Sequence, residues 1–144
     1  MVKAVRIHEH GGPEVLRYED VDPGRPGRGE VLIRQTAIGL NFIDTYFRTG
    51  LYPSPSGLPL TLGGEAAGEV IELGEGVDSL KPGDRVAYTG GPGSYAGQRV
   101  MPAERLVKIP DGISDDQAAA MMLKGMTAEY LLRRAYAVKP GDNV

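Results

Sequence analysis

The sequence has 144 residues, of which 41% are hydrophobic and 24% are charged, and it contains 21 glycines and 11 prolines. This length supports one domain with a core of ordinary size and excludes two full-sized domains. The formal net charge of −3 argues against binding of nucleic acid or a membrane surface by bulk electrostatics, and the absence of cysteine excludes disulfides and thiol nucleophiles. The N-terminus lacks a signal-peptide core and no apolar run is long enough to span a bilayer, so we expect a cytoplasmic protein that does not cross a membrane.

Short strand patterns dominate the chain up to residue 109. Apolar and polar residues alternate with period two, or form short apolar runs, between clusters of glycine and proline. Seven strands are predicted, over residues 1–7, 15–21, 30–40, 65–73, 85–89, 94–101 and 106–109. Short strands joined by tight turns indicate a mainly β fold, and six or seven of them favour a barrel.

Two helices are predicted. Asn41 precedes the segment 42–49, which has an acid three residues after Asn41, as is typical of a helix N-terminus, and Gly50 is a typical helix end. A second helix begins after Ser114, because Ser114 and Gln117 have the spacing of a capping box. Six apolar residues of this second helix fall broadly along one side of it: Ala118, Met121, Met122, Met126, Leu131 and Leu132.

One short segment occurs twice. LKPGDRV at residues 80–86 recurs as VKPGDNV at residues 138–144, and proline followed by glycine suits the central positions of a type II turn. The first copy leads into a predicted strand. The second copy should do the same, but the sequence contains at most two residues of that strand. We therefore expect the sequence to be part of a longer protein, whose continuation begins with a buried strand.

One glycine-rich segment partly matches the fingerprint of a dinucleotide-binding loop. GPGSYA at residues 91–96 fits G-x-G-x-x-A, but that fingerprint binds pyrophosphate only where a helix begins within the glycine loop. Here strand-like residues follow, up to Pro102. We predict a loop between two strands.

Five segments together carry a resemblance to a known family. They are NFIDTYFRTGLYP (41–53), LGGEAAGEV (62–70), GDRVAY (83–88), GSYAGQRVMPAERLVKIP (93–110) and AAAMMLKGMTAEYLL (118–132). Over essentially its whole length the sequence resembles the N-terminal catalytic domain of the quinone oxidoreductases in the medium-chain dehydrogenase/reductase superfamily. The resemblance implies a GroES-like β-barrel with short helices, and a C-terminal helical segment that leads to a Rossmann domain missing from this sequence.

The resemblance also implies a domain boundary, a cofactor and partners. Residues 1–124 would form the GroES-like catalytic domain, and residues 125–144 would be the truncated start of the nucleotide-binding domain. NADPH would be bound mainly by the missing domain, and a quinone would be the substrate. The full-length protein would be a homodimer without a membrane or nucleic-acid partner.

The zinc-dependent alcohol dehydrogenases of the superfamily bind their catalytic zinc through a cysteine in G-x-C-G-x-D and a histidine in G-H-E. By resemblance, these two positions fall on Asn41 and Gly64. A zinc site needs three or four Cys, His or carboxylate ligands, which Glu65 alone cannot supply. His8 and His10 adjoin a Gly-Gly-Pro turn, which is typical of an exposed loop. We therefore predict no metal and no Lewis-acid activation of an alcohol.

Three polar residues near the first helix are candidate catalytic residues. Hydride transfer to a quinone requires placement and hydrogen bonding of the quinone oxygens, with little acid or base chemistry. Asn41 offers an amide at a helix N-terminus, and Tyr46 and Tyr52 offer flat walls with hydroxyl groups. The alternatives are helix capping for Asn41 and packing for the tyrosines. Asp44 is expected to stabilise the first helical turn.

Asn41, Lys124 and Thr127 are the candidate cofactor-binding residues. Lys124 interrupts an apolar run and must reach solvent, a carboxylate or a bound anion. Thr127 shares its face if the helix is continuous. The resemblance implies that this segment faces the nicotinamide end of NADPH. The alternatives are a surface position for Lys124 and, for Thr127, a hydrogen bond to the carbonyl four residues earlier.

These observations predict the catalytic domain of a zinc-independent NADPH:quinone oxidoreductase, inactive as the isolated 1–144 fragment. A second interpretation is an NADPH-dependent enone or alkene reductase of the same superfamily, in which Tyr46 or Tyr52 donates a proton to carbon. A third is a non-catalytic relative such as a lens crystallin or an RNA-binding protein, although the net charge argues against RNA.

Overall fold

A computed structural model describes all 144 residues of the chain. Its eight strands are β1 (Val2–Ile7), β2 (Arg17–Val21), β3 (Glu30–Gly39), β4 (Leu60–Thr61), β5 (Glu65–Leu73), β6 (Arg85–Thr89), β7 (Gln98–Pro102) and β8 (Val107–Lys108). The helices are α1 (Phe42–Thr49) and α2 (Asp115–Glu129), with short 3-10 helices at Pro13–Val15 and Ala103–Arg105 and a π-helical turn at Tyr130–Ala135. The prediction of a mainly β fold with short helices and a C-terminal helical segment is confirmed.

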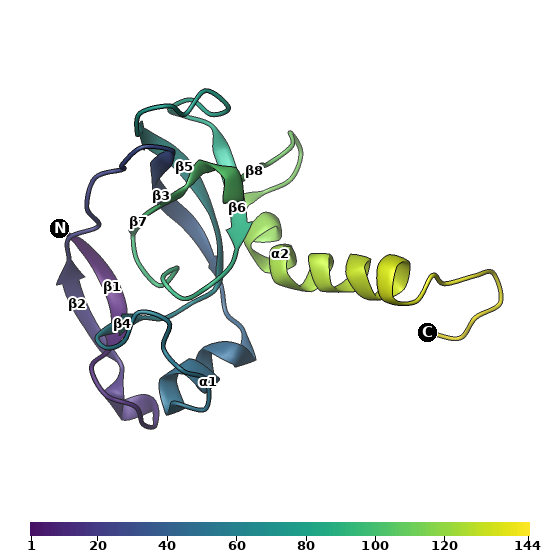
Figure 1. Cartoon of the computed structure of the whole chain (residues 1–144), viewed down its shortest axis with the longest axis horizontal. Coiled ribbons are helices and arrows are strands. Elements are labelled where there is room, and N and C mark those ends of the chain that lie inside the picture. Colours follow the sequence, from purple (N-terminus) through teal and green to yellow (C-terminus); the bar gives the residue numbers. More distant parts are fainter.

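The strands form two antiparallel sheets. β1 lies between β2 and β4 in the smaller sheet, and the order in the larger sheet is β7-β3-β5-β6-β8. Residues 94–97 connect the two: the N–H of Val5 in β1 donates to the carbonyl of Tyr95 at 2.8 Å, and the N–H of Gln35 in β3 donates to the carbonyl of Gly97 at 3.0 Å. In Figure 1 the smaller sheet lies beside the larger one, with α1 below them and α2 leaving to the side.

The main core is formed largely by side chains of the larger sheet. Its buried members are Val31, Ile33, Ala66, Val70, Leu80, Val86, Tyr88, Met101 and Ala103. A second, alanine-rich contact fixes α2, since Ala118 and Ala119 pack on Ala67 of β5 and Ala87 of β6. These small side chains let the helix approach the sheet closely, so the first half of α2 becomes part of the domain.

Polar contacts fix the N-terminus of α2. Ser114 and Gln117 form the predicted capping box, in which the N–H of each residue donates to the side-chain oxygen of the other, at 3.0 and 3.2 Å. Arg85 of β6 forms an ion pair with Asp115 at 2.6 Å, and Thr36 of β3 donates to the same carboxylate. α2 is therefore held against β3, β5 and β6.

The second half of α2 and the C-terminus project away from both sheets (Figure 1). Of the predicted apolar side, Ala118 is buried and Met122 is half-buried, but the remaining four members are exposed: Met121, Met126, Leu131 and Leu132. Most of these residues therefore do not face the core, and Leu131 and Leu132 lie in the π-helical turn beyond α2. No helix of the chain combines the length and apolar character needed to cross a bilayer.

The predicted strand over residues 94–101 is shorter than expected. β7 begins at Gln98, because the side-chain amide of Gln35 donates to the carbonyls of Ser94 at 3.0 Å and Ala96 at 2.6 Å, which holds that segment in a loop. No helix begins in the glycine-rich segment 91–96, so the prediction of a loop between strands is confirmed.

Both copies of the Lys-Pro-Gly-Asp repeat form the predicted turn. Gly83 and Gly141 have φ of 91° and 95°, the left-handed conformation that the third position of a type II turn requires. In each copy the aspartate N–H donates to the lysine carbonyl at 3.1 Å, and the aspartate carboxylate accepts the lysine N–H, at 3.0 Å in the first and 2.8 Å in the second. The first copy leads directly into β6.

Candidate active site

Glu65, the first residue of β5, is a fully buried carboxylate. Its Oε1 accepts hydrogen bonds from Asn41 Nδ2 at 2.8 Å and Lys124 Nζ at 2.6 Å, and its Oε2 accepts the N–H of Leu123 at 2.7 Å. A buried charge needs such partners, because an unpaired carboxylate away from water is strongly destabilising. Glu65 therefore joins the end of β3, the start of β5 and the middle of α2 at one point.

Gly39 allows these elements to come together. It pairs with Glu65 across β3 and β5. A Cβ atom at this position would lie 2.4 Å from Glu65 Cγ and 2.7 Å from the carbonyl oxygen of Ala119 in α2. Both distances are too short for any side chain, so glycine is required by the close approach of the carboxylate and the helix.

Asn41 lies between β3 and α1. Its side chain, together with Glu65 and Lys124, forms what we call the Glu65 cluster. Its Nδ2 donates to Glu65, and its Oδ1 accepts from Lys124 Nζ at 2.6 Å. These partners fix the orientation of the amide, because the carboxylate only accepts and the ammonium only donates. Asn41 is the N-cap residue of α1, as predicted, but the first turn is stabilised by Asp44, whose carboxylate accepts the Asn41 N–H at 2.9 Å.

Lys124 reaches a carboxylate, one of the three destinations that the sequence allowed. Its side chain is 57% exposed, whereas that of Glu65 is 0% exposed. An ammonium group has three N–H donors, and two of them are used by Asn41 and Glu65. The third has no acceptor within the protein. A fixed, positively charged donor thus lies at the surface above a buried negative charge.

Opposing effects set the pKa of Glu65. Burial by itself raises this pKa, whereas the hydrogen bonds from Lys124, the Leu123 N–H and Asn41, together with the positive charge of Lys124, lower it below its ordinary value. The carboxylate is therefore ionised at neutral pH. Glu65 and Lys124 form a pair whose charges balance.

Asp44 connects this cluster to the loop between β6 and β7. It is buried, and its Oδ2 accepts both the Asn41 N–H and the hydroxyl of Tyr95, the latter at 2.8 Å. Burial and the adjacent Asp44 carboxylate raise the pKa of Tyr95 well above its ordinary value, so this hydroxyl stays protonated. The prediction that Asp44 stabilises the first turn of α1 is confirmed. In addition, Asp44 holds the loop that contains Tyr95 against this turn.

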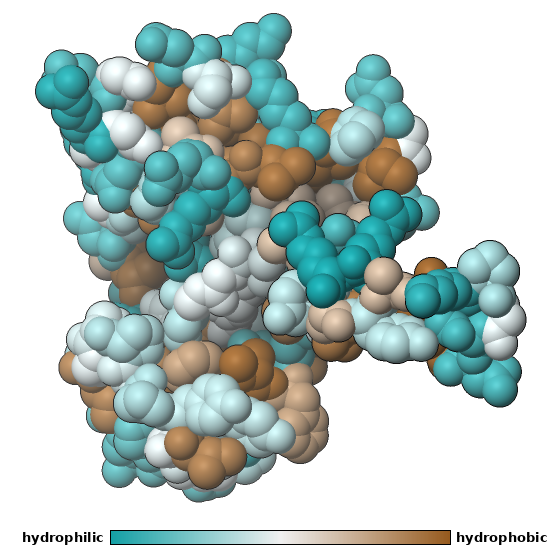
Figure 2. Space-filling view, turned by 45° about the vertical axis from the view of Figure 1, so that its right-hand side comes forward, coloured by the Kyte–Doolittle hydropathy of each residue, from teal (hydrophilic) through white to brown (hydrophobic).

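Tyr46 and Tyr52 form an aromatic cluster with their phenylalanine neighbours. Their ring centroids are 5.3 Å apart, Phe42 meets Tyr46 edge-on at 5.4 Å, and Phe47 meets Tyr52 edge-on at 5.9 Å. Neither tyrosine hydroxyl hydrogen-bonds to the protein, and the Tyr52 side chain is exposed. Hydrophobic side chains also gather on the lower part of the surface in Figure 2, where Figure 1 places α1. The rings pack as the alternative interpretation expected, but both hydroxyls remain available to a ligand.

Thr127 does not join the cluster. Its hydroxyl donates to the carbonyl of Leu123 at 2.7 Å, which is the backbone bond that the alternative interpretation named. The oxygen of the hydroxyl retains capacity to accept a hydrogen bond. The structure therefore brings Asn41 and Lys124 into direct contact and places Thr127 one turn further along α2, without a contact to either.

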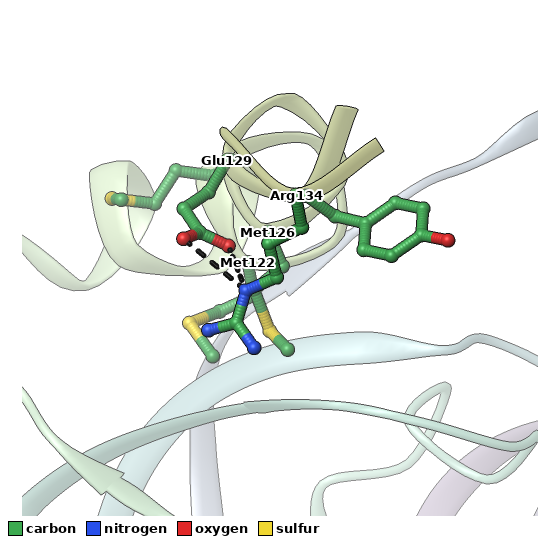
Figure 3. Close-up of a pocket in the computed structure, with 7 residues that line it drawn as sticks. Met122, Met126, Glu129 and Arg134 are labelled. Atoms are coloured by element: carbon green, nitrogen blue, oxygen red, sulfur yellow. Dashed lines mark hydrogen bonds and ion pairs between the residues drawn. The ribbon is translucent and has the colours of Figure 1, made fainter. Parts of the chain in front are cut away.

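A separate groove follows the exposed side of α2. Its volume is about 430 Å³, and its lining residues are Met121, Met122, Gly125, Met126, Glu129, Tyr130 and Arg134. Figure 3 shows Arg134 turned toward Glu129, with which it forms an ion pair at 3.3 Å. The groove is mainly apolar and its only charged groups neutralise each other, so it offers a contact surface and no chemistry.

The residues at the superfamily's zinc positions do not fit a zinc ion. Asn41 Oδ1 faces the ammonium of Lys124, Gly64 has no side chain, and no group of three or more His, Cys, Asp or Glu residues is placed to hold a metal. His8 and His10 are turned to different partners, Glu19 and the carbonyls of Phe47 and Arg48 respectively. The absence of metal stays a prediction, to be tested by elemental analysis.

Sequence reasoning treated Glu65 only as an insufficient zinc ligand and missed that it organises the site. Its partners are 24, 58 and 59 residues away, so no local pattern could reveal them. Two signals were present: an acid begins a strand of small and apolar residues, and a lysine interrupts an apolar helix. Each of these charges needs a partner, and the Glu65 carboxylate and the Lys124 ammonium are partners of each other.

Comparison with known proteins places the chain in a family. Residues 27–111 match the family described as "Alcohol dehydrogenase GroES-like domain". The chain is 54% identical, over its whole length, to a quinone oxidoreductase of Pseudomonas aeruginosa, of which it covers 44%. It is 47% identical to a 2-haloacrylate reductase of a Burkholderia species, of which it covers 45%.

A solved structure agrees with these sequence comparisons. The quinone oxidoreductase of Escherichia coli, crystallised in complex with NADPH, superimposes with a TM-score of 0.93 and 46% identity, over 97% of this chain and 43% of that one. The chain thus spans less than half the length of the relatives it matches. It belongs to the alcohol dehydrogenase GroES-like domain family, and within the medium-chain dehydrogenase/reductase superfamily it corresponds to the N-terminal domain of the quinone oxidoreductases.

Proposed function

We propose that residues 1–144 form the catalytic domain of a zinc-independent, NADPH-dependent quinone reductase, in which a nucleotide-binding domain completes the site. The observation that carries this proposal is the Glu65 cluster. Asn41, at one of the two positions where the zinc enzymes have a metal ligand, instead belongs to a cluster in which a buried carboxylate, an amide and an ammonium group hold one another in place. Such a cluster supplies hydrogen-bond donors without any metal.

Quinone reduction suits these groups. The acceptor carbonyl needs donors that face the developing charge, and little proton transfer by the protein. Tyr46 and Tyr52 would present their hydroxyls and flat rings to a quinone. Bound NADPH would supply the hydride. Several relatives that match by sequence are named quinone oxidoreductases, and one solved relative contains NADPH.

The chain offers a surface for only one end of the cofactor. Asn41 and Thr127 have amide and hydroxyl groups that fit the polar carboxamide of a nicotinamide. No helix of the chain begins in a glycine-rich loop of the kind that binds a pyrophosphate. In this proposal the completing domain provides that site, with the boundary after residue 124, within the continuous helix α2. The completed protein would be a cytoplasmic homodimer.

A second candidate function is the reduction of an activated alkene. The 47% identity to a 2-haloacrylate reductase favours it, because that protein's name describes reduction of an unsaturated carboxylate. The reaction uses the same hydride but also places a proton on carbon, for which Tyr46 or Tyr52 is the candidate donor.

The two functions can be compared in a completed enzyme. We define this enzyme as residues 1–144 joined to the remainder of the Pseudomonas aeruginosa quinone oxidoreductase, with the intact Pseudomonas protein as the control. NADPH oxidation would be followed with 1,4-benzoquinone and with 2-chloroacrylate. A higher kcat/KM for benzoquinone supports the proposed function, a higher value for chloroacrylate supports the second candidate, and a folded enzyme that reduces neither contradicts both.

A further inference from the structure

We propose that Lys124 is a catalytic residue whose ammonium group binds the acceptor oxygen that becomes negative during hydride transfer, with Glu65 as its positioning residue. This inference rests on the proposed reductase function. It gives Lys124 a contact with the acceptor, in place of the cofactor contact expected from sequence.

The hydrogen bonds of Lys124 fix the direction of its remaining N–H group. The Nζ atom is bonded to Cε and donates to Asn41 Oδ1 and Glu65 Oε1, both at 2.6 Å. The four directions around an ammonium nitrogen are tetrahedral, so these three fix the fourth. The fourth is an N–H without a protein acceptor, on a side chain that is 57% exposed. It is a charged donor with a set direction and a place for one ligand.

The Glu65 carboxylate is rigid and therefore holds Lys124 in place. Glu65 cannot turn, because its other oxygen accepts the N–H of Leu123 at 2.7 Å and its side chain is fully buried. Gly39 leaves no free volume beside it. A lysine on its flexible four-carbon stem is otherwise mobile, and a donor that must be ordered during the reaction contributes less than one already in place. Glu65 thus acts through Lys124 and does not touch the acceptor.

The chemistry of the acceptor follows from this geometry. The acceptor gains a hydride at the expense of the reduced nicotinamide, its conjugated oxygen takes up the negative charge, and a proton from solvent neutralises that oxygen. Lys124 forms and breaks no covalent bond. The substrate class is therefore an acceptor whose oxygen is conjugated to the carbon or oxygen that receives the hydride, such as a quinone or an α,β-unsaturated carbonyl compound. A cationic acceptor without such an oxygen gains nothing from Lys124.

This difference between acceptors provides the kinetic test. In the completed enzyme, Lys124→Met should lower kcat for 1,4-benzoquinone about 100- to 1000-fold, as removal of one oxyanion donor does elsewhere. The kcat for a phenazinium cation, which accepts a hydride and loses its charge, should change less than about threefold. The matched control is Lys108→Met, since Lys108 is 56% exposed and pairs with Asp84 at 2.8 Å. It should leave both values unchanged.

A second variant serves as the control for the loss of charge balance in the cluster. Lys124→Met leaves Glu65 as a buried anion without its cation, so the double variant Lys124→Met/Glu65→Gln removes both charges. It should show the same selective loss of benzoquinone reduction. An equal loss with both acceptors would assign Lys124 a structural role and overturn the proposal, as would full retention of benzoquinone reduction in either variant.

A binding measurement on the 144-residue chain separates this inference from the reductase proposal. The chain, labelled with ¹³C at Cε of its five lysines, would be titrated with the anion of 2-hydroxy-1,4-naphthoquinone. The Lys124 resonance, identified by its loss in Lys124→Met, should shift further than that of Lys108, and Glu65→Gln should reduce the shift. Equal shifts of both lysines, or none, contradict the inference. A completed enzyme that reduces no quinone contradicts the proposed function, while the titration still decides whether Lys124 binds an oxygen anion.

Discussion

Replacement of Glu65 by glutamine should destabilise the domain by about 2–4 kcal/mol, although the two side chains have nearly the same shape. A carboxylate presents two acceptor oxygens, whereas glutamine presents one oxygen and one NH₂ group. In one orientation the NH₂ group faces the N–H of Leu123, and in the other it faces the donors of Asn41 and Lys124. Either orientation places donors against each other in a buried site.

The magnitude follows from three terms. A buried N–H left without an acceptor costs about 1–3 kcal/mol, and the weaker bonds to a neutral oxygen cost about 1 kcal/mol more. Solvent screening of the exposed Lys124 ammonium, and the lower cost of burying a neutral amide than a carboxylate, keep the total from exceeding that sum. The expected loss is still a large fraction of the about 5–15 kcal/mol by which domains are stable.

Urea unfolding of the 144-residue chain, followed by circular dichroism, measures this loss. The matched control is Glu69→Gln, which lies on the same strand and pairs with Arg34 at 2.5 Å, but is partly exposed and should cost less than about 1 kcal/mol. A free energy of unfolding for Glu65→Gln within about 0.5 kcal/mol of the unmodified chain would refute the view that Glu65 organises the site.

The same comparison has a defined pH dependence. The pKa of Glu65 is lowered in the folded state, so its ionised form contributes stability above the pKa of an unfolded glutamate, about 4.3, and that contribution is lost as the pH falls through the lower folded value. The difference between the unmodified chain and Glu65→Gln should therefore be largest at neutral pH and shrink below about pH 4. A difference that grows on acidification would contradict this sign.

Gly39, Tyr52 and the cofactor affinity of the isolated chain can be tested in the same way. Gly39→Ala should lower the free energy of unfolding by about 1–3 kcal/mol, because its Cβ would meet Glu65 and the backbone of α2. The matched control Gly90→Ala, whose Cβ would have no atom within 4 Å, should be nearly neutral. Equal losses for the two variants would contradict this prediction. Tyr52→Phe should reduce benzoquinone turnover in the completed enzyme about tenfold while changing stability by less than about 0.5 kcal/mol, and unchanged kinetics would leave Tyr52 a packing residue. Calorimetry of the isolated chain should find NADPH binding weaker than about 1 mM, with no quinone reduction, and a micromolar Kd would count against the division between domains.

The parts of the fold predicted well from sequence are those that local chemistry decides. The capping box at Ser114, the end of α1 at Gly50 and both Lys-Pro-Gly-Asp turns depend on residues within a few positions of one another. The strand over residues 65–73 was predicted with its observed bounds, because its flanking glycine-rich segments mark both ends.

The parts that were missed depend on distant partners. The segment 94–97 has the composition of a strand, but the side chain of Gln35, about sixty residues earlier, takes the carbonyls that a strand would use. Asn41 has the pattern of a helix cap, but its amide is turned to Glu65 and Lys124, far away in sequence. Likewise, the apolar residues predicted along one side of the second helix are mostly exposed, which their spacing alone could not reveal.

In the proposed quinone reductase, the cluster of Glu65, Asn41 and Lys124 serves the reaction without a catalytic zinc. The most direct test is metal analysis and benzoquinone turnover of the completed enzyme, produced in zinc-supplemented medium, before and after dialysis against a strong chelator. The account predicts no stoichiometric zinc and the same kcat in both preparations. One zinc ion per chain, with activity lost on chelation and restored by added zinc, would contradict it.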